Sequence, residues 1–235
     1  MTVMTQSSSA VPKHVGIVLD GNRRWAKKEG IPILEGHRRG AEVFKEVSLA
    51  AFDRGVSYLS AFVFSTENWT RTEDEVSYLM KLVVKAVERY LDEFHKKGIR
   101  IIVIGQCESL SSSVVRAIEK TEDKTKDNKK GTLVLCFNYG GQQEIVDATK
   151  QIIEKNINPQ DVTTEIFEQN LYAPEIPPVD LLIRTSGEQR TSGFMLWRAA
   201  YAELLFSDKL WPDYAVDDLD DALSEFNTRQ RRFGG

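Results

Sequence analysis

The chain has 235 residues, of which 41% are hydrophobic and 28% are charged, and this composition fits a globular protein with a substantial buried core. Its net charge of -4 gives no basic surplus of the kind that nucleic-acid-binding proteins usually carry, so we expect no nucleic-acid partner. Residues 1–13 are polar and lack the apolar stretch of a signal peptide, so we expect a flexible tail and a cytoplasmic protein. Cys107 and Cys136 lie far apart without metal-ligand spacing and are expected to be reduced structural thiols.

Short apolar runs alternate along the chain with segments of helical length. The expected strands are 15–19, 58–64, 101–105, 133–137, 179–183 and 204–206. The expected helices are 36–53, 73–97, 109–127, 141–156 and 163–171. Strands that alternate with helices favour a mostly parallel six-stranded sheet covered on both faces, in a single α/β domain that we place at 14–235.

A first candidate functional segment follows the strand expected at 15–19. Asp20 stands at the carboxyl end of this strand, where open parallel sheets bind ligands. The residues that follow it are Gly21, Asn22, Arg23, Arg24 and Trp25. A carboxylate can hold a hard cation, a glycine lets the backbone approach closely, and guanidinium groups neutralise anionic oxygens. The segment therefore suits a metal-bound phosphoester, although a strand–turn–helix corner capped by Asp20 would use the same residues.

A second segment follows the strand expected at 58–64. Its residues are Ser65, Thr66, Glu67, Asn68, Trp69, Thr70 and Arg71. They bring hydroxyl, amide, indole and guanidinium groups to the edge of the sheet where ligands are expected. Thr72 and Glu75 could form a capping box for the next helix. Because capping needs neither Trp69 nor Arg71, a binding role and a capped loop are equal alternatives.

A third segment begins with Arg184, directly after the strand expected at 179–183, and continues to Arg190, Thr191 and Ser192. Guanidinium groups match phosphate oxygens in a bidentate way, so this segment favours a diphosphate cradle. A solvated surface loop is the alternative.

The segment 76–94 carries apolar residues at helical spacing. They are Val76, Leu79, Met80, Val83, Val87, Tyr90, Leu91 and Phe94, and Leu82, Val84 and Ala86 widen the apolar surface. One apolar stripe is typical of a helix that packs on a sheet. The wider surface could also line a cavity for an apolar ligand, and the sequence leaves both readings open.

Taken together and in this order, the segments resemble the cis-prenyltransferase family, also called the undecaprenyl diphosphate synthase family. The resemblance runs from His14 to Gly235 and is carried by eight motifs: Asp20-Gly21-Asn22-x-Arg24-Trp25, Gly36-His37-x-x-Gly40, Phe64-Ser65-x-Glu67-Asn68-Trp69-x-Arg71, Asn138-Tyr139-Gly140-Gly141, Arg184-Thr185-x-Gly187-Glu188-x-Arg190-x-Ser192, Tyr201-Ala202-Glu203, Leu210-Trp211-Pro212-Asp213 and Arg231-Arg232-Phe233-Gly234-Gly235. Any single motif would be weak evidence, whereas eight in series are highly specific.

The resemblance implies an activity. Members of the family condense an allylic diphosphate, often farnesyl diphosphate, with isopentenyl diphosphate and form a cis double bond at each step. A Mg²⁺-dependent, chain-elongating homodimer is therefore expected, with an undecaprenyl-type carrier-lipid precursor as its product. That product would be delivered to a membrane, so the protein could be peripheral there. The helix at 73–97 would form a wall of the apolar product tunnel with Val63 nearby, and Arg232-Phe233-Gly234 would reach toward the active site.

The resemblance also implies roles for single residues. Asp20 would coordinate Mg²⁺ in catalysis, and Glu203 would support the metal from the same or the partner subunit. Asn68 would position the isopentenyl group, because an amide is a poor base. The allylic diphosphate would lie near Gly21, Asn22, Arg23, Arg24, His37 and Arg71, and isopentenyl diphosphate near Arg184, Arg190 and Ser192. Further candidate substrate-binding residues are Trp25, Ser65, Thr66, Glu67, Trp69 and Thr191.

Two positions depart from the family pattern. Ile33 stands where members often have an arginine, so one diphosphate contact is missing or Arg23 replaces it. Gly193 stands where asparagine is frequent.

Four other interpretations compete with this one. Asp217-Asp218-Leu219-Asp220-Asp221 matches the aspartate-rich motif of the all-helical trans-prenyltransferases, but a single copy is better explained as the acidic first turn of a helix. A non-catalytic accessory subunit of a heteromeric enzyme would tend to lose Asp20 and the arginines. A phosphohydrolase would usually place a second carboxylate where Asn22 stands. A short-chain cis-prenyl diphosphate synthase differs only in tunnel depth, which the sequence does not reveal.

Overall fold

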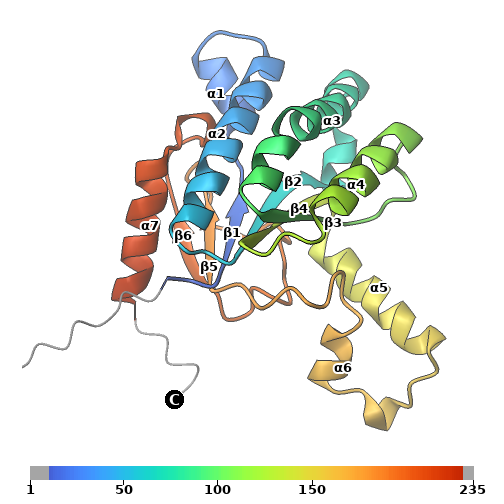
Figure 1. The fold of residues 1–235 in the computed structure, drawn as a ribbon. Coiled ribbons are helices and arrows are strands. Elements are labelled where there is room, and N and C mark those ends of the chain that lie inside the picture. The colour runs from blue at the N-terminus through green and yellow to red at the C-terminus, as the bar shows by residue number, and fades with distance from the viewer. Residues whose placement is uncertain (1–10, 230–235) are drawn as a thin grey trace, which may run out of the picture.

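Six parallel strands form the central sheet in the computed structural model, which describes residues 11–229 (Figure 1). In chain order the strands are β1 (His14–Val18), β2 (Tyr58–Ser65), β3 (Ile99–Ile104), β4 (Gly131–Tyr139), β5 (Leu181–Arg184) and β6 (Glu203–Phe206). Their order across the sheet is β3-β4-β2-β1-β5-β6, and each neighbouring pair is parallel. The predicted six-stranded α/β architecture is confirmed.

Seven α-helices are described in this part of the chain, and three short 3₁₀ helices accompany them. The α-helices are α1 (Asn22–Lys28), α2 (Ile33–Asp53), α3 (Glu73–Lys96), α4 (Ser112–Thr125), α5 (Gly141–Glu154), α6 (Thr164–Glu168) and α7 (Val216–Thr228). The 3₁₀ helices are η1 (Thr66–Thr70), η2 (Pro159–Asp161) and η3 (Trp211–Asp213). The helices expected from periodicity all exist, with ends that move by a few residues.

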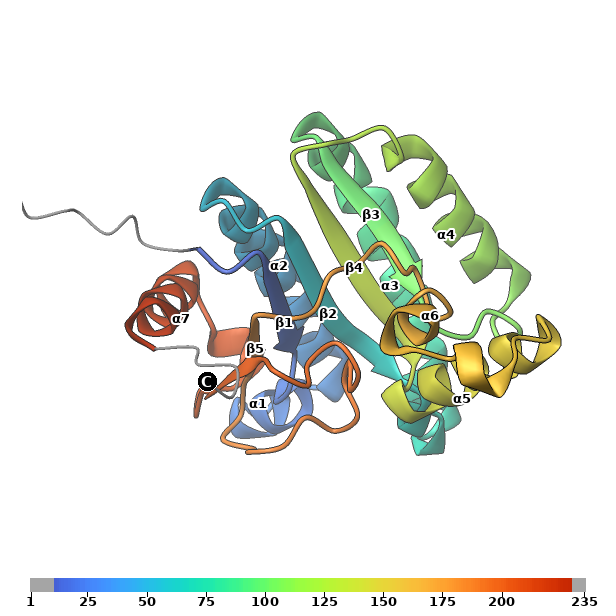
Figure 2. The ribbon, with the colours of Figure 1, turned by 90° about the horizontal axis from the view of Figure 1, so that it is seen from below.

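One face of the sheet is covered by α2, α3 and α7. Val43 and Val47 of α2, Leu91 of α3 and Leu219 of α7 belong to the same buried cluster as Ile17 of β1. β1 is buried along its whole length, as expected for a central strand whose apolar run does not alternate with polar residues. This face is where α2 and α3 run side by side from the ligand edge of the sheet (Figures 1 and 2).

The opposite face differs from the expectation of helices on both sides. Its buried cluster combines strand residues with the irregular segments 172–180 and 185–202, including the fully buried Phe194 and Met195. The helices α5 and α6 extend away from the sheet (Figure 1). A buried ion pair holds these irregular segments, because Nη1 of Arg198 lies 2.6 Å from Oε1 of Glu144 and Nη2 donates to the carbonyl oxygen of Tyr172. Specific polar contacts hold this part of the chain in place, and they leave no periodic pattern of hydrophobic residues in the sequence. The arrangement could therefore not be predicted from that pattern.

Several further expectations have outcomes in the fold. Asp217 and Asp218 lie in the first turn of α7, which confirms the helix-start interpretation of the aspartate-rich run. Cys107 and Cys136 are both free thiols, as expected, and Cys136 is buried whereas Cys107 is exposed. The tail expected at 1–13 lies mostly outside the described residues, but the carbonyl oxygen of Lys13 accepts backbone hydrogen bonds from Ser57 and Tyr58 and is tied to the sheet.

His14 is a fully buried histidine at the start of β1. Its Nδ1 lies 2.8 Å from the carbonyl oxygen of Pro177, to which it donates, and its Nε2 lies 2.7 Å from the Ser60 hydroxyl, from which it accepts. Burial lowers the pKa of His14 from its ordinary 6.5 to about 4, although the hydrogen bond to Pro177 opposes this. The unfolded chain therefore binds a proton between pH 6.5 and 4 that the folded protein excludes, and stability falls as the pH falls through this window.

His14→Gln is expected to flatten the pH dependence of stability. The wild-type protein should lose about 3 kcal/mol more of its free energy of unfolding than the variant between pH 7 and pH 4, since one pKa unit corresponds to about 1.4 kcal/mol. Urea unfolding followed by circular dichroism at a series of pH values measures the difference. Other titrating groups are common to both proteins and cancel, so parallel profiles would contradict the assignment.

Candidate active site

The carboxyl ends of the central strands meet at one edge of the sheet. Val18 of β1 lies opposite Phe62 of β2 and Arg184 of β5 in the strand pairing. The segment after β1, η1 after β2, and the end of β5 therefore come together, at the edge where parallel sheets bind ligands. The three segments that were predicted separately border a common cavity of about 700 Å³.

Asp20 is a half-buried carboxylate between two guanidinium groups. Its Oδ2 lies 2.8 Å from Nη2 of Arg184 and 3.4 Å from Nη2 of Arg24. Burial by itself would raise the pKa of Asp20, but hydrogen bonds from Arg184 and Ser186 and the charges of both arginines hold it below its usual value. The Thr185 hydroxyl accepts from the backbone N–H of Asp20 at 3.0 Å and is 2.7 Å from its carbonyl oxygen. Asp20 is thus ionised at neutral pH and does not cap α1, whose N-cap is Gly21.

Arg184 is buried and organises the third segment. Its Nη1 donates to the carbonyl oxygen of Arg190 and to the hydroxyl of Ser192, each at 2.7 Å. Its Nε is buried with no hydrogen-bond partner among the described residues. The guanidinium group of Arg190 lies at the surface instead, 2.6 Å from Glu188. Arg184 and Ser192 line the cavity, whereas Arg190 lies outside its lining.

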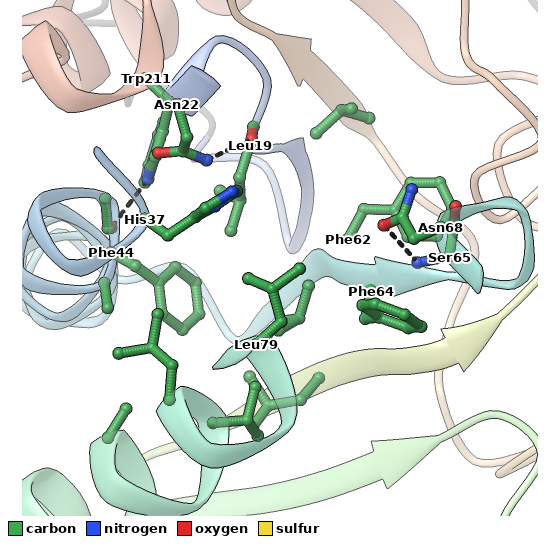
Figure 3. A pocket seen from close by; sticks show the side chains of 18 of the residues that line it. Leu19, Asn22, His37, Phe44, Phe62, Phe64, Ser65, Asn68, Leu79 and Trp211 are labelled. Atoms are coloured by element: carbon green, nitrogen blue, oxygen red, sulfur yellow. Dashed lines mark hydrogen bonds between the residues drawn. The ribbon is translucent and has the colours of Figure 1, made fainter. Parts of the chain in front are cut away.

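Two glycines of α2 let α1 approach closely. A Cβ atom at Gly36 would lie 2.3 Å from the carbonyl oxygen of Asn22, and one at Gly40 would lie 2.1 Å from its Oδ1. The Nδ2 of Asn22 donates to the carbonyl oxygen of Leu19 at 3.2 Å, and Nε1 of the buried Trp211 donates to that of Gly40 at 2.9 Å. This packing explains the Gly36-His37-x-x-Gly40 motif, because it places Asn22 and His37 on one wall of the cavity (Figure 3).

The second segment forms η1 and faces Asn22 and His37 across the cavity. Oδ1 of Asn68 accepts from the backbone N–H of Ser65 at 3.1 Å, and both residues line the cavity (Figure 3). Trp69 turns away from this cavity, and its Nε1 donates to Oδ1 of Asn138 at 2.7 Å. The left-handed Asn138 also donates to Gln106, so it ties η1 to the segment after β3.

A cluster of basic groups surrounds Glu75 in the first turn of α3. Oε1 of this carboxylate lies 2.9 Å from Nη1 of Arg71 and 3.3 Å from Nε2 of His37, and Oε2 lies 3.8 Å from Nε of Arg23. Desolvation and the charge of Arg71 lower the pKa of His37 from its ordinary value, while Glu75 opposes this shift. Arg71 and His37 line the cavity, so its mouth carries a fixed guanidinium and an imidazole that can gain a proton.

Beyond this polar mouth the cavity is mostly apolar. The lining residues of α3 are Leu79, Leu82, Val83, Ala86, Val87, Tyr90, Leu91 and Phe94. At 1.5 Å per residue, Leu79 to Phe94 spans about 22 Å of helix. Phe44 of α2 and Val63, Leu133 and Leu135 of the sheet add further apolar walls, and Lys45 of α2, whose Nζ lies 5.9 Å from the centre of the Tyr90 ring, adds a charged group. The wide apolar surface seen in the sequence thus serves a cavity, while Val76 and Met80 pack toward α4 and Phe64.

The predicted site residues divide into two groups. Those lining the cavity are Asp20, Asn22, His37, Ser65, Glu67, Asn68, Arg71, Arg184 and Ser192. Those outside its lining are Gly21, Arg23, Arg24, Trp25, Thr66, Trp69, Arg190, Thr191 and Glu203. Arg23 and Arg24 remain linked to it through Glu75 and Asp20. Glu203 is the first residue of β6 and so lies at the amino end of that strand, whereas Asp20 follows the carboxyl end of β1. The Glu203 carboxylate lies 3.1 Å from Nη1 of Arg229, so Asp20 and Glu203 of one chain do not meet.

Sequence reasoning missed several residues of the site. Gln142 and Leu196 line the cavity without having been singled out, and Glu75 had been read only as a helix cap. The available signal for Glu75 was its position four residues after Arg71, a separation at which opposite charges can pair. α1 is a short polar helix without apolar periodicity, and it is not among the helices expected from the sequence.

The side chains at this site suit a divalent cation only when a bound ligand supplies further oxygen atoms. Among residues 11–229, no three His, Cys, Asp or Glu side chains are arranged to hold a metal. Mg²⁺ is commonly bound by one or two carboxylates together with substrate phosphates and waters, so a single ionised Asp20 fits it. A cationic mouth above an apolar cavity favours an amphiphile with an anionic head.

Comparisons with known proteins agree with this geometry. Residues 18–234 match the prenyltransferase family model described as undecaprenyl diphosphate synthase. The isoprenyl transferase of Thermotoga maritima is 44% identical over 227 residues, which cover 96% of this chain and 97% of that protein. Isoprenyl transferase 2 of Corynebacterium glutamicum is 46% identical, with coverages of 95% and 94%.

Two solved structures share the fold. The structure of lavandulyl diphosphate synthase from Lavandula x intermedia in complex with dimethylallyl diphosphate has a TM-score of 0.93 and 33% identity, and covers 96% of this chain and 99% of its own. A probable undecaprenyl diphosphate synthase from Campylobacter jejuni has a TM-score of 0.82 and 32% identity, with coverages of 96% and 100%.

Gly36→Ala is expected to separate α1 from α2. The added methyl group would meet the backbone carbonyl oxygen of Asn22, which cannot turn aside as a side chain can. Thermal unfolding should show a loss of about 1–3 kcal/mol, and calorimetry should show weaker binding of inorganic diphosphate. Glu46→Ala on the exposed face of the same helix is the control. A Gly36→Ala protein with wild-type stability and affinity would refute this role of the glycine.

Proposed function

This chain belongs to the undecaprenyl diphosphate synthase family of prenyltransferases, and on that basis we propose that it is a chain-elongating cis-prenyltransferase. It would condense isopentenyl diphosphate with an allylic diphosphate, with farnesyl diphosphate as the primer and an undecaprenyl-type diphosphate as the product. The observation that carries the proposal is the continuous cavity of about 700 Å³, cationic at its mouth and apolar in its depth. Such a shape holds a diphosphate at the sheet edge while a prenyl chain occupies the space beneath α3.

The allylic diphosphate is assigned to the wall formed by α1, α2 and the segment between η1 and α3. Asn22, His37 and Arg71 line the mouth there, and Arg23 and Arg24 lie beside it. Guanidinium groups bind phosphate oxygens bidentately, which supports this side for the anionic head. The apolar walls begin at Phe44 and Leu79 directly beyond, so the prenyl chain would point inward (Figure 3).

Isopentenyl diphosphate is assigned to the opposite wall. Arg184 and Ser192 line the cavity there, already hydrogen-bonded to each other. Arg190 would turn from Glu188 toward the diphosphate when it binds. Asn68, held by the backbone of Ser65, would orient the isopentenyl group rather than remove its proton, because an amide is a poor base.

Asp20 would hold Mg²⁺ together with the oxygens of a bound diphosphate. When bound, the cation would supply charge stabilisation for the departing diphosphate. Two arginines would assist this charge stabilisation. Arg184 and Arg24 keep the pKa of Asp20 low, and Arg24 places a second positive charge 3.4 Å from the Asp20 carboxylate. The diphosphate would depart with the electron pair of the allylic C–O bond, and these guanidinium groups can stabilise the resulting anion.

We also propose a homodimer. β6 is an edge strand, and the apolar Leu204 on it is exposed, as is Tyr201 just before it. Such exposed apolar groups at a sheet edge favour a protein interface. A dimer would allow Glu203 of one chain to approach the site of the other. Within residues 11–229 no helix is both long and apolar enough to span a bilayer. We propose that the product is delivered to a membrane through a peripheral contact.

A second candidate is a short-chain cis-prenyl diphosphate synthase. The structural neighbour with a TM-score of 0.93 is a lavandulyl diphosphate synthase in complex with dimethylallyl diphosphate, and this favours a short primer for the present chain as well.

Product analysis by mass spectrometry separates these functions. The protein would receive Mg²⁺, isopentenyl diphosphate and either dimethylallyl, geranyl or farnesyl diphosphate, with a chelator-treated sample as control. We expect long cis-polyprenyl diphosphates from farnesyl diphosphate and no product after chelation. Short products would select the second candidate. Absence of condensation with every primer would contradict both and favour an accessory subunit.

Asp20→Ala is expected to abolish turnover, with a loss of at least about 100-fold in kcat, because the carboxylate that would hold the cation is removed. Arg184 keeps its bonds to Arg190 and Ser192, so the variant should fold and assemble normally. Asp217→Ala, in the exposed first turn of α7, should retain wild-type activity. Unfolding of the Asp20 variant, or activity close to wild type, would remove Asp20 from the chemistry.

A further inference from the structure

The connection between α1 and α2 exposes apolar side chains to solvent. We call residues 27–33 the tip, and they project at the top of the view in Figure 1. Every residue of the tip is exposed, and Ile31 and Ile33, on either side of Pro32, each keep 38% of their surface accessible. Consecutive exposed apolar residues indicate a contact site, because their exposure to water is unfavourable.

The turn that presents these residues is fixed by backbone hydrogen bonds. α1 ends at the left-handed Gly30 (φ +68°), whose N–H donates to the carbonyl oxygen of Lys27 at 3.3 Å. The N–H of Ile31 donates to the carbonyl oxygen of Ala26 at 3.0 Å, which completes a Schellman motif. Pro32 then fixes the backbone where α2 begins. The apolar side chains are thus presented on a preformed turn, and little backbone entropy is lost when they meet a partner.

The tip lies in a positively charged part of an acidic chain. Residues 23–39 contain six arginine or lysine residues and two glutamates, which gives this stretch a net charge of +4. The whole chain carries -4, so the remaining residues carry -8. Lys28 is 64% exposed, with Nζ 3.7 Å from Asp213, and Lys27 makes no ion pair within residues 11–229. Exposed apolar groups beside basic groups are complementary to a surface that is anionic outside and apolar beneath.

The tip also stands next to the mouth of the cavity. Ile33 begins α2, and His37, which lines the mouth, follows one helical turn later. Four residues of helix span about 6 Å. Amphipathic segments bury their apolar groups about 5–10 Å into the surface of a bilayer. Insertion of the tip would therefore bring the mouth to the level of the lipid headgroups.

We propose that the tip docks on the surface of a membrane that contains anionic phospholipids and sets the mouth of the cavity against it; the benefit for product release rests on the proposed function. Ile31 and Ile33 would enter the boundary between headgroups and acyl chains, while Lys27 and Lys28 would bind lipid phosphates. Release of a prenyl chain into water exposes apolar surface in proportion to its length. A bilayer at the mouth gives that chain an apolar destination.

A protein partner fits the tip less well than a bilayer. A stable protein interface needs roughly 800 Å² from each partner, which is far more than a short projecting turn supplies. A bilayer surface has no such requirement, because a few inserted side chains and basic groups are sufficient for reversible binding. The surface proposed for the homodimer lies elsewhere, at Tyr201 and Leu204.

The test is co-sedimentation of the full chain with vesicles of equal parts phosphatidylglycerol and phosphatidylcholine, without substrates. The double variant Ile31→Ser, Ile33→Ser should bind about tenfold more weakly than the wild type, because apolar surface is lost from the contact. The control is Val146→Ser, Ile153→Ser, which removes two exposed apolar side chains from α5 and should bind like the wild type. Absence of wild-type binding, or equal weakening in the control, would overturn the proposal.

Lys27→Gln tests the electrostatic part of the contact. It should weaken binding to the same vesicles about fivefold, and this difference should shrink at high salt, where charges are screened. Lys129→Gln removes an exposed charge from the turn before β4 and serves as the control. Equal binding of the two lysine variants, or equal wild-type binding to vesicles of phosphatidylcholine alone, would rule out an anionic surface as the partner.

Ile31→Trp remains informative if the serine variant fails to fold. Tryptophan is favoured at the interface between membrane and water, so binding should tighten severalfold. Addition of vesicles should also shift the fluorescence of this variant to shorter wavelength by more than it shifts that of the wild type. An unchanged affinity together with an unchanged spectrum would contradict insertion of the tip.

Vesicle binding needs no turnover, so it is independent of the proposed function. Protein that binds vesicles through the tip but condenses nothing would contradict the proposed function alone, whereas protein that condenses its substrates but binds no vesicles would overturn the docking alone. Analytical ultracentrifugation covers the remaining occupant. If the serine variant changes the oligomeric state and the wild type ignores vesicles, the tip is a protein interface and the proposal is wrong.

Discussion

The ion pair between Asp20 and Arg184 joins two neighbouring strands at the edge of the sheet where the cavity opens. Its 2.8 Å contact has three consequences. It keeps Asp20 ionised, it gives the buried guanidinium of Arg184 a counter-charge, and it links the segment after β1 to the end of β5. The parallel register makes this contact possible, since Val18 and Arg184 are directly paired. Everything proposed about catalysis depends on this one pair of charges being fixed before any substrate binds.

Close backbone approach is the second constraint. Gly36 and Gly40 admit Asn22 against α2, and Gly141 does the same for the segment after Ser192, because a Cβ atom there would lie 2.2 Å from the carbonyl oxygen of Gly193. The two walls of the cavity mouth are each built on such a contact. A larger side chain at any of these glycines would displace polar groups of the cavity mouth as well as apolar side chains. We therefore expect these glycines to affect ligand binding.

The helix α3 serves two kinds of chemistry along one length. Its first turn carries Glu75 among basic groups, and the turns from Leu79 to Phe94 line an apolar cavity. A ligand held at this site therefore meets charge at one end and hydrocarbon at the other within a single element. This division explains why the apolar surface of the helix exceeds what packing on a sheet requires, and why Val76 and Met80, which face α4, lie outside the cavity.

The sequence by itself determined the α/β class, the six strands, the long helices and the three polar segments, because hydrophobic periodicity and strand-end motifs are local properties. It also determined the family through eight short motifs in series. Only the tertiary structure decided that Trp69 turns to Asn138, that Glu203 is remote from Asp20 within the chain, and that Glu75 gathers three basic groups. The irregular cover made by 172–180 and 185–202 could not be predicted from the sequence either. Those features arise from contacts between residues far apart in the chain, whose energies depend on burial and distance, and neither quantity exists until the chain has folded.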